Sequence, residues 1–282
     1  MTAWEPWIGR CIVQQDVLTA ATLARFRATI DSAATGETAE QAIHWCLCLP
    51  DAPTAALGAD GHPRREDSPD SFMPPIPLPR RMWAASDATF HAPFRAGAAI
   101  ERTSTIAAIN EKSGGTGKLV FVEVDHETRA DGELAVSERQ TIVFREPPPA
   151  AAGAVAGEAP EGDPDLSGWT WHRELLPDEA LLFRYSALTF NSHRIHYDLP
   201  YATAEEGYRG LVVHGPLTAT LLLDLAQREL GPNALTAFRM RAQAPAFCGE
   251  PLHLVGRAKE DGWEMAAIGP DGRTIMAAEA KA

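Results

Sequence analysis

The sequence contains little that would fit a secreted or membrane protein. Only 4 of its 282 residues are cysteines, Cys11, Cys46, Cys48 and Cys248, and this pattern has neither the density of a disulfide framework nor the spacing of a zinc knuckle. The N-terminal residues lack the basic segment and apolar run of a secretory signal. No stretch approaches the roughly 18 consecutive apolar residues of a membrane span. We therefore expect reduced thiols, a cytoplasmic location and no membrane partner.

The chain also has few basic residues relative to its acidic residues. The chain carries 25 Lys and Arg residues against 38 Asp and Glu residues, which gives a formal net charge of −13. Nucleic-acid binding depends on clustered Lys and Arg side chains that neutralise phosphates, so we expect no nucleic-acid partner. With 45% hydrophobic and 22% charged residues, the composition is that of a globular protein and excludes the disordered, collagen-like and coiled-coil classes.

The chain divides nearly in half at a segment of Pro, Ala and Gly that has almost nothing to bury, residues 147–164. This composition predicts an exposed linker between an N-terminal unit, 1–146, and a C-terminal unit, 165–282. Each unit ends in three β-rich segments with an Asp-Gly turn before the last, a pattern that favours hairpins. These segments are 99–110, 119–125 and 134–144 in the first unit and 252–258, 263–268 and 274–280 in the second.

Each unit also contains a candidate helix. Residues 19–30 and 216–230 have apolar side chains at helical spacing, and Ala and Leu around most of the second segment predict a deeply buried helix. A long buried helix wrapped by an antiparallel sheet is the hotdog arrangement. Two similar units joined by a linker therefore predict an α+β double hotdog, in which two antiparallel sheets each wrap around a central helix and meet at their edge strands.

Polar side chains that can handle a proton or a water gather in one part of the second unit: Asn191, His193, His196 and His214. A lone histidine is usually a packed or surface imidazole, but this group stands beside the predicted helix start at Gly215. A helix start offers unpaired N–H groups and the positive end of the helix dipole, and glycine lets a ligand approach the main chain closely. A thioester carbonyl resting on the Gly215 amide would have its developing enolate charge stabilised.

The run Tyr-Ser-Ala-Leu-Thr-Phe-Asn-Ser-His-Arg-Ile-His-Tyr-Asp at 185–198 resembles the hydratase motif of MaoC-like, (R)-specific enoyl-thioester hydratases and dehydratases. Val-His-Gly-Pro-Leu at 213–217 resembles their helix-start motif. In these motifs an Asp and a His five positions later hold the catalytic water, and the glycine amide binds the thioester oxygen. Here His196 and Gly215 match, and Asn191 occupies the aspartate position. The resemblance implies that His196 polarises the water while Asn191 orients it.

His193 and Arg194 replace the usual Asn-Pro of the motif. This variant is similar to the branch that contains bacterial mesaconyl-C4-CoA and itaconyl-CoA hydratases and mitochondrial 3-hydroxyacyl-thioester dehydratases. Gly-His-Pro at 61–63 and Pro-Pro-Ile-Pro-Leu-Pro-Arg-Arg-Met-Trp at 74–83 extend the likeness into the first unit. The resemblance implies reversible hydration of a short, branched, dicarboxylic enoyl-CoA without a cofactor. The first unit would help to form the acyl and CoA pocket without catalysing, and we expect a homodimer or a higher homo-oligomer.

The remaining roles fall to side chains near these motifs. An amide cannot exchange a proton usefully, so His196 must act as both acid and base unless His193 or Asp198 assists. A positively charged side chain would bind the distal carboxylate or the phosphates of CoA, and an aromatic ring could stack on adenine. The substrate-binding candidates are Arg81, Arg194, His193, His214 and Tyr197.

Other interpretations of the same residues stay open at this point. His193, His196 and His214 could bind zinc, although no nearby carboxylate completes a familiar pattern, and we expect no metal. Residues 113–118 look like a phosphate-binding loop, but Leu119 stands where a Ser or Thr would hold magnesium, so a turn is favoured. The alternative functions are a hotdog thioesterase and a non-catalytic acyl-thioester-binding protein.

Overall fold

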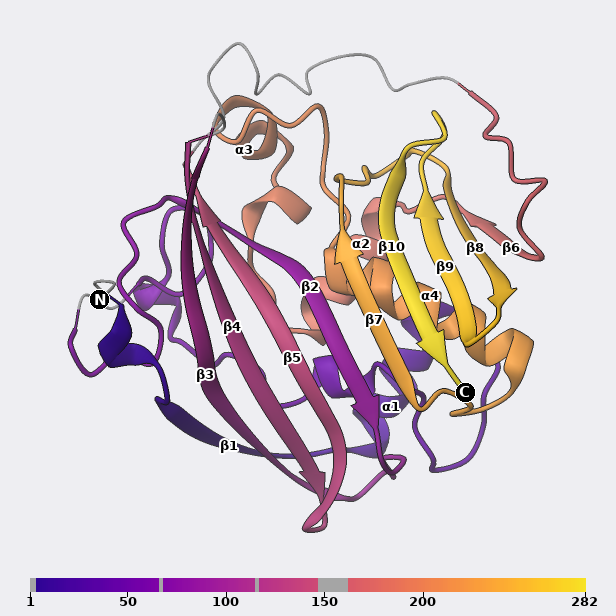
Figure 1. The fold of residues 1–282 in the computed structure, drawn as a ribbon, viewed down its shortest axis with the longest axis horizontal. Helices are drawn as coiled ribbons and strands as arrows, with labels where there is room; N and C mark the ends of the chain where they lie inside the picture. The colour runs from indigo at the N-terminus through magenta and orange to yellow at the C-terminus, as the bar shows by residue number, and fades with distance from the viewer. Residues whose placement is uncertain (1–3, 66–67, 115–116, 147–161) are drawn as a thin grey trace.

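The centre of the molecule is an antiparallel sheet to which both halves of the chain contribute (Figure 1). The computed structural model describes residues 4–65, 68–114, 117–146 and 162–282. Within these residues the sheet has ten strands in the order β1-β3-β4-β5-β2-β7-β10-β9-β8-β6. The N-terminal half supplies β1 to β5 and the C-terminal half supplies β6 to β10, and the two sets join where β2 pairs with β7. This arrangement is the predicted double hotdog, with its two antiparallel sheets joined edge to edge.

The long strands belong to the N-terminal half and the long helix to the C-terminal half. The strands are β1 (Cys11–Val17), β2 (Arg80–Phe90), β3 (Ala99–Gly114), β4 (Gly117–Ala130), β5 (Glu133–Arg145), β6 (Trp171–Leu175), β7 (Ala237–Ala242), β8 (Leu252–Lys259), β9 (Gly262–Ile268) and β10 (Thr274–Lys281). The helices are α1 (Ala20–Ile30), α2 (Glu179–Leu188), α3 (Leu199–Ala204) and α4 (Gly215–Leu230). Short 3-10 turns are η1 (Glu5–Trp7), η2 (Ile43–Cys46), η3 (Thr54–Ala56) and η4 (Arg194–His196).

The six segments predicted as strands are confirmed, since each lies within one strand of the meanders β3-β4-β5 and β8-β9-β10. The turn between β4 and β5 has positive φ at both Asp131 and Gly132, 50° and 85°, as a tight hairpin turn requires. Of the glycine-rich run at 113–118, the described residues pair across β3 and β4, Ser113 with Lys118 and Gly114 with Gly117. The strands β1, β2, β6 and β7 lie outside the predicted segments.

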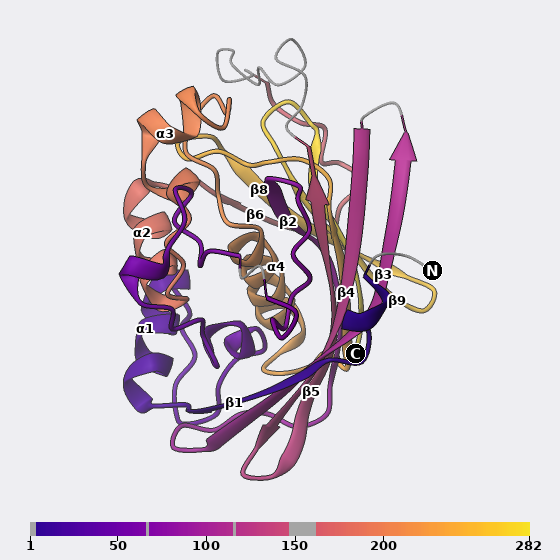
Figure 2. The ribbon, with the colours of Figure 1, turned by 90° about the vertical axis from the view of Figure 1, so that its left-hand side faces the viewer.

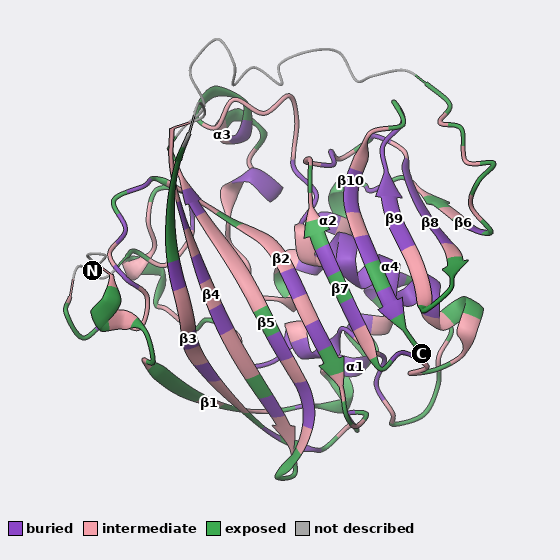
Figure 3. Ribbon diagram, viewed as in Figure 1, coloured by how far each residue is buried: buried purple, intermediate pink, exposed green. Residues whose placement is uncertain are grey.

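The helices cover one face of the sheet in two layers (Figure 2). The inner layer is α4, which packs directly on β6, β8 and β9, and every residue from Leu217 to Ala226 is buried. The helix α1 follows Thr19, whose side chain accepts a hydrogen bond from the Thr22 N–H as a cap. It packs against α2 and η2, and it buries one face, formed by Leu23, Phe26, Thr29 and Ile30. Figure 3 shows the continuous burial of α4 against the alternating burial of the strands.

Two further predictions concern the linker between the halves and membrane spans. The linker predicted at 147–164 falls mostly on 147–161, which lie outside the described residues. Among the described residues, no helix combines the length and the apolar character needed to cross a membrane.

Candidate active site

The hydratase-motif loop connects α2 to α3, and both of its ends are fixed by local interactions. At its start, Phe190 adopts a left-handed backbone with a φ of 49°, and the Asn191 N–H donates to the Ser186 carbonyl at 2.8 Å. At its end, the Asp198 carboxylate caps α3 by accepting from the Tyr201 N–H at 3.1 Å. These local contacts define the shape of the loop where it leaves α2 and where it enters α3.

His196 lies in the interior of this site, with 7% of its surface exposed. Its Nδ1 lies 2.7 Å from the Val212 carbonyl oxygen. Because a carbonyl only accepts, Nδ1 carries the hydrogen and Nε2 keeps a free lone pair. The ring stacks on His214 with centroids 3.6 Å apart. Burial lowers the pKa of His196 to about 3 and that of His214 well below its usual value, so both imidazoles are neutral near pH 7 and can accept a proton.

Gly215 begins α4 directly after His214, which places the stacked imidazoles beside the N-terminus of the helix. Within the described residues the His214 side chain does not cap this end of the helix, and Pro216 has no N–H. The Gly215 amide can therefore donate to a ligand. Trp83 of β2 lies on the other side, because a Cβ added at Gly215 would lie 3.5 Å from its ring. The N-terminal half thus forms one wall of the site.

Asn191 uses half of its amide within its own loop. Its Oδ1 accepts a hydrogen bond from the His193 N–H at 3.0 Å, the geometry of a local Asx turn. The Nδ2 group remains as the donor that could orient a water. The structure therefore brings His193, His196, His214 and Gly215 together, with Asn191 partly committed to shaping the loop.

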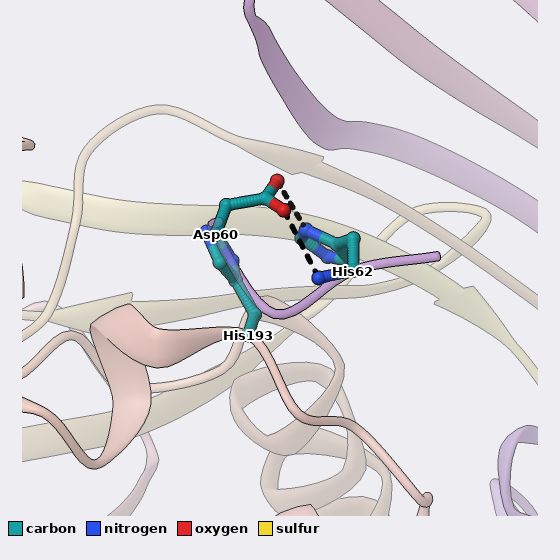
Figure 4. Close-up of side chains that lie close together, drawn as sticks. All are labelled: Asp60, His62 and His193. Carbon is teal, nitrogen blue, oxygen red and sulfur yellow. Dashed lines mark hydrogen bonds and ion pairs between the residues drawn. The ribbon is translucent and has the colours of Figure 1, made fainter. Parts of the chain in front are cut away.

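Two residues of this site were missed by sequence reasoning, Asp60 and His62, which come from the loop at 58–62 in the N-terminal half (Figure 4). The Nδ1 of His62 lies 3.0 Å from Asp60 Oδ2, and the His62 N–H donates to Asp60 Oδ1 at 3.0 Å. The His62 ring lies 4.1 Å from the ring of His193, which lies 5.5 Å from that of His196. The sequence did hold a signal, because a carboxylate stands two residues before the histidine of the Gly-His-Pro run.

The loop at 58–62 is attached to the motif loop by main-chain contacts. The Ser192 hydroxyl donates to the Gly61 carbonyl at 2.5 Å, and the Arg194 N–H donates to the Asp60 carbonyl at 2.9 Å. Gly61 has a φ of 87°, and a Cβ there would lie 1.9 Å from the Ser192 carbonyl oxygen. A side chain at this position would push the loops apart, so glycine is required.

His62 has the negative charge of Asp60 and the positive charge of Arg81 in its surroundings. Burial lowers the pKa of His62 against the opposing effect of Asp60, and Arg81 adds to the lowering. Burial opposes the ionisation of Asp60, but the hydrogen bonds from His62 outweigh it and hold the pKa of the carboxyl below its ordinary range. Burial and His62 also lower the pKa of His193, to about 3. The resting site is thus one carboxylate facing neutral imidazoles.

Arg81 of β2 is a charged side chain without a partner. Among the residues that the structure describes it makes no hydrogen bond or ion pair, and its pKa is lowered by burial and by nearby Arg65. Its neighbour Arg80 is paired instead, with Nη2 3.1 Å from a carboxylate oxygen of Glu206. Arg81 lowers the pKa of both His62 and His193, and within the described residues its donors are free for an anion.

Arg194 and Tyr197 serve the loop itself. Arg194 donates twice to one oxygen of Asp198, at 2.9 and 2.7 Å, donates to the Ala59 carbonyl at 2.9 Å, and its guanidinium lies 4.0 Å from the ring centroid of Tyr201. Tyr197 is 51% exposed, and its hydroxyl donates to the Ser192 carbonyl. Their roles as substrate contacts stay predictions, and Arg194 has few donors left for one.

The zinc interpretation of the three motif histidines does not fit their contacts. Nδ1 of His196 is bonded to a carbonyl and Nε2 of His214 lies 2.8 Å from the Ser186 hydroxyl. Within the described residues, the nearby group whose ligand atoms lie within 4.8 Å of one another is instead Asp60, His62 and His193. The unpaired guanidinium of Arg81 beside this group opposes a divalent cation.

Comparisons with known proteins give the family of the chain. A model of the family "hydroxyacyl-thioester dehydratase type 2" matches residues 40–248. The mesaconyl-C4-CoA hydratase of Chloroflexus aurantiacus is 41% identical over 279 residues, which cover 98% of this chain and 96% of the relative. The chain belongs to the hydroxyacyl-thioester dehydratase type 2 family.

Solved structures support the fold of this family member. A MaoC-like dehydratase superposes with a TM-score of 0.72 at 15% identity, covering 99% of both chains. A Mycobacterium tuberculosis protein reported to have a double hotdog fold superposes with a TM-score of 0.58 at 13% identity, covering 97% of this chain and 95% of the other. The chain is therefore a double-hotdog enzyme of the enoyl-CoA hydratase/dehydratase type.

Proposed function

We propose that this enzyme adds water reversibly to a short, branched, dicarboxylic enoyl-CoA, mesaconyl-C4-CoA or itaconyl-CoA, giving citramalyl-CoA. The observation that carries the reaction type is the neutral His196, whose free Nε2 lies in a ring stacked on the histidine that precedes the Gly215 amide. A base and an oxyanion donor stand side by side. The 41% identity to a mesaconyl-C4-CoA hydratase supports the choice of substrate.

The reaction follows from these two groups. Nε2 of His196 takes a proton from a water held by Asn191 Nδ2, and the water oxygen bonds to the β-carbon. The electron pair of the double bond moves to the thioester oxygen, where the Gly215 N–H and the helix dipole stabilise the enolate. The α-carbon then takes a proton, which the protonated His196 can return or a second group can supply.

Arg81 supports the dicarboxylic part of the proposal. The half-buried guanidinium of Arg81, which makes no hydrogen bond or ion pair within the described residues, gains a charge-assisted hydrogen bond when a carboxylate arrives, and such bonds contribute about 1.5–3 kcal/mol. Arg194 is already paired with Asp198, so Arg81 is the better candidate for the distal carboxylate. Trp83 beside Gly215 would then limit the length of the acyl group.

The test is a panel of C4 to C8 enoyl-CoAs with and without a distal carboxylate, followed by loss of the enoyl-thioester absorbance and by product analysis. We expect hydroxyacyl-CoA products, and a lower KM for mesaconyl-C4-CoA and itaconyl-CoA than for crotonyl-CoA. Free CoA with a carboxylic acid would indicate a thioesterase, and tight binding without absorbance loss would indicate a non-catalytic binding protein. Light scattering on the same sample tests the proposed homodimer or higher homo-oligomer.

A further inference from the structure

The N-terminal half places a carboxylate and an imidazole, Asp60 and His62, at the hydratase-motif loop of the other half (Figure 4). The motif residue expected to be an aspartate is Asn191, whose amide cannot exchange a proton and whose Oδ1 is used within its loop. Asp198, the carboxylate within the motif loop itself, caps α3 and accepts hydrogen bonds from Arg194. Asp60 is therefore the carboxylate that faces the histidines of the site.

The pair is held in a rigid turn. The Gly58 N–H donates to the His62 carbonyl at 2.7 Å, and both oxygens of Asp60 accept hydrogen bonds from His62, one from the main chain and one from the ring. The side chain of His62 is 22% exposed and that of Asp60 is 36% exposed, so a substrate can reach the ring. Three hydrogen bonds from the motif loop, donated by Ser192 and Arg194, fix the turn in place.

The hydrogen bond also fixes the tautomer of His62. A carboxylate only accepts, so Nδ1 of the ring carries a hydrogen and Nε2 is the atom that can gain or lose the second proton. A carboxylate in this position stabilises the imidazolium form, as in the paired imidazoles of hydrolases. Within the described residues Nε2 has no hydrogen-bond partner.

We propose that Asp60 and His62 take the place of the missing motif aspartate: His62 is a second proton-transfer residue of the reaction, and Asp60 positions it and stabilises its charged form. The inference rests on the proposed hydratase function and extends it by assigning chemistry to the N-terminal half. The catalytic groups of one site then come from both halves of the chain.

Two residues, His196 and His62, together balance the protons of the hydration reaction. In hydration, Nε2 of His196 takes a proton from water as the C–O bond forms at the β-carbon, and the electron pair of the double bond moves to the thioester oxygen. His62, which is neutral in the resting site and takes up a proton when the substrate binds, then gives its Nε2–H proton to the α-carbon as the enolate collapses. His196 has gained one proton and His62 has lost one, and the ring of His193 lies between them, 5.5 and 4.1 Å away, so that it can carry the proton back.

The charges around His62 connect this role to the substrate. Asp60 favours the imidazolium, whereas Arg81 and Arg65 oppose it, and His193 packs against the ring as a neutral group. A substrate carboxylate bound to Arg81 would cancel one of the opposing charges. A dicarboxylic thioester would thus help to protonate the residue that must donate to its α-carbon.

The decisive experiment compares His62→Gln, His62→Ala and Asp60→Asn with the wild type on mesaconyl-C4-CoA and crotonyl-CoA. Exposed residues of the same half supply matched controls, His91→Gln and Asp51→Asn, which should keep wild-type rates. We expect His62→Gln to lower kcat by about 10²–10⁴-fold with KM changed by less than about threefold. Free imidazole should restore at least about tenfold of the activity of His62→Ala, as a proton-transfer role requires.

Asp60→Asn provides the readout that separates positioning from folding. Because hydration requires protonated His62, kcat falls as the pH rises through the pKa of His62. Removal of the carboxylate lowers that pKa, so the basic limb of the kcat profile should move to lower pH while circular dichroism stays unchanged.

Three results would overturn the inference. The first is a wild-type kcat in His62→Gln, and the second is loss of activity without imidazole rescue and without a shifted pH profile in Asp60→Asn, which would show a structural role. The third is a wild-type enzyme that loses activity with a chelator and regains it with zinc, because the cluster would then hold a metal. A wild-type protein that hydrates none of the enoyl-CoAs would remove the proposed function itself, and this inference with it.

Discussion

The two halves of the molecule share a strand pattern but differ in what fills the inner face of their sheets. In the C-terminal half a helix of 16 residues, α4, lies there with its middle buried throughout. In the N-terminal half the helix α1 has 11 residues and packs against α2 and η2, with one face buried. The start of α4 lies beside Trp83 of β2. We therefore expect the C-terminal half to supply the oxyanion donor of the proposed reaction.

The N-terminal half also has a polar interior of its own. Glu138 of β5 accepts hydrogen bonds from the Ser86 hydroxyl at 2.5 Å and from the Trp45 indole at 3.0 Å, and the buried His44 of η2 lies 3.6 Å from its other oxygen. His44 also borders a cavity of about 200 Å³. This half supplies long strands, a wall at Trp83 and the loop at 58–62, which is how a half without the motif contributes to the site.

The largest effect on activity is expected for a substitution in the C-terminal half, which contains the start of α4. His196→Ala should lower kcat by about 10²–10⁴-fold, because it removes a positioned proton-transfer group. KM should change little, since the thioester oxygen would still rest on the Gly215 amide. Steady-state kinetics with circular dichroism as a fold check tests this, and His172→Ala, an exposed histidine of the same half, is the control. Turnover near the wild-type rate would remove His196 from the mechanism and make His193 the next candidate.

The sequence predicted the C-terminal half better than the N-terminal half. The meanders, the α4 boundaries and the cluster of His193, His196, His214 and Gly215 followed from local patterns of alternating residues, turns and helix starts. Asp60 and His62 did not, because their place depends on a loop packing against Ser192, some 130 residues away in the chain. The distinction between Arg81 and Arg194 also required the structure, since only the fold shows which arginine already has a carboxylate.

The second-largest expected effect is on KM, for substitution of Arg81 in the N-terminal half. Arg81→Met should raise KM for a dicarboxylic thioester by about 10–100-fold, the equivalent of a charge-assisted hydrogen bond, and change KM for crotonyl-CoA little. Arg194→Met should affect both substrates alike because it loosens the motif loop. The adjacent Arg80→Met, which loses an ion pair with Glu206, is the matched control. Equal effects on both substrates in all three variants would mean that neither Arg81 nor Arg194 binds the carboxylate.

A smaller effect is expected at the motif position that departs from the family pattern. Asn191→Ala should lower kcat by about 10–100-fold, because it removes one oriented hydrogen bond and a turn contact that contribute about 1–3 kcal/mol together. Asn191→Asp keeps the acceptor for the His193 N–H and adds a carboxylate, which raises the pKa of His196. A measured kcat for Asn191→Asp at or above that of Asn191→Ala fits this interpretation. Damage greater than that of His196→Ala would reverse the assigned roles.

The smallest effect is on stability, and it concerns two buried titratable groups of the N-terminal half that act in different ranges of pH. His126 of β4 has a pKa lowered to about 4, mainly by burial, so the folded state keeps it neutral. As the pH falls from about 6.5 toward 4, the unfolded chain binds a proton that the folded chain refuses, and this group lowers the free energy of unfolding by at most about 1.4 kcal/mol per pH unit. His126→Asn should therefore flatten the slope of unfolding free energy against pH in that window.

Glu138 provides the contrasting window in the same half. Burial opposes its ionisation, but the nearby His44 and His126 and the hydrogen bond from the Ser86 hydroxyl lower its pKa to about 2, so its contribution is complete above about pH 4.5 and is lost as the pH falls toward 2. Urea unfolding of His126→Asn and Glu138→Gln between pH 3 and pH 7 should therefore show slopes altered above about pH 4 in the first variant and below about pH 4.5 in the second. If both variants changed the slope in one window, His126 and Glu138 would titrate as one coupled group, and the N-terminal interior would respond to acid as a single unit.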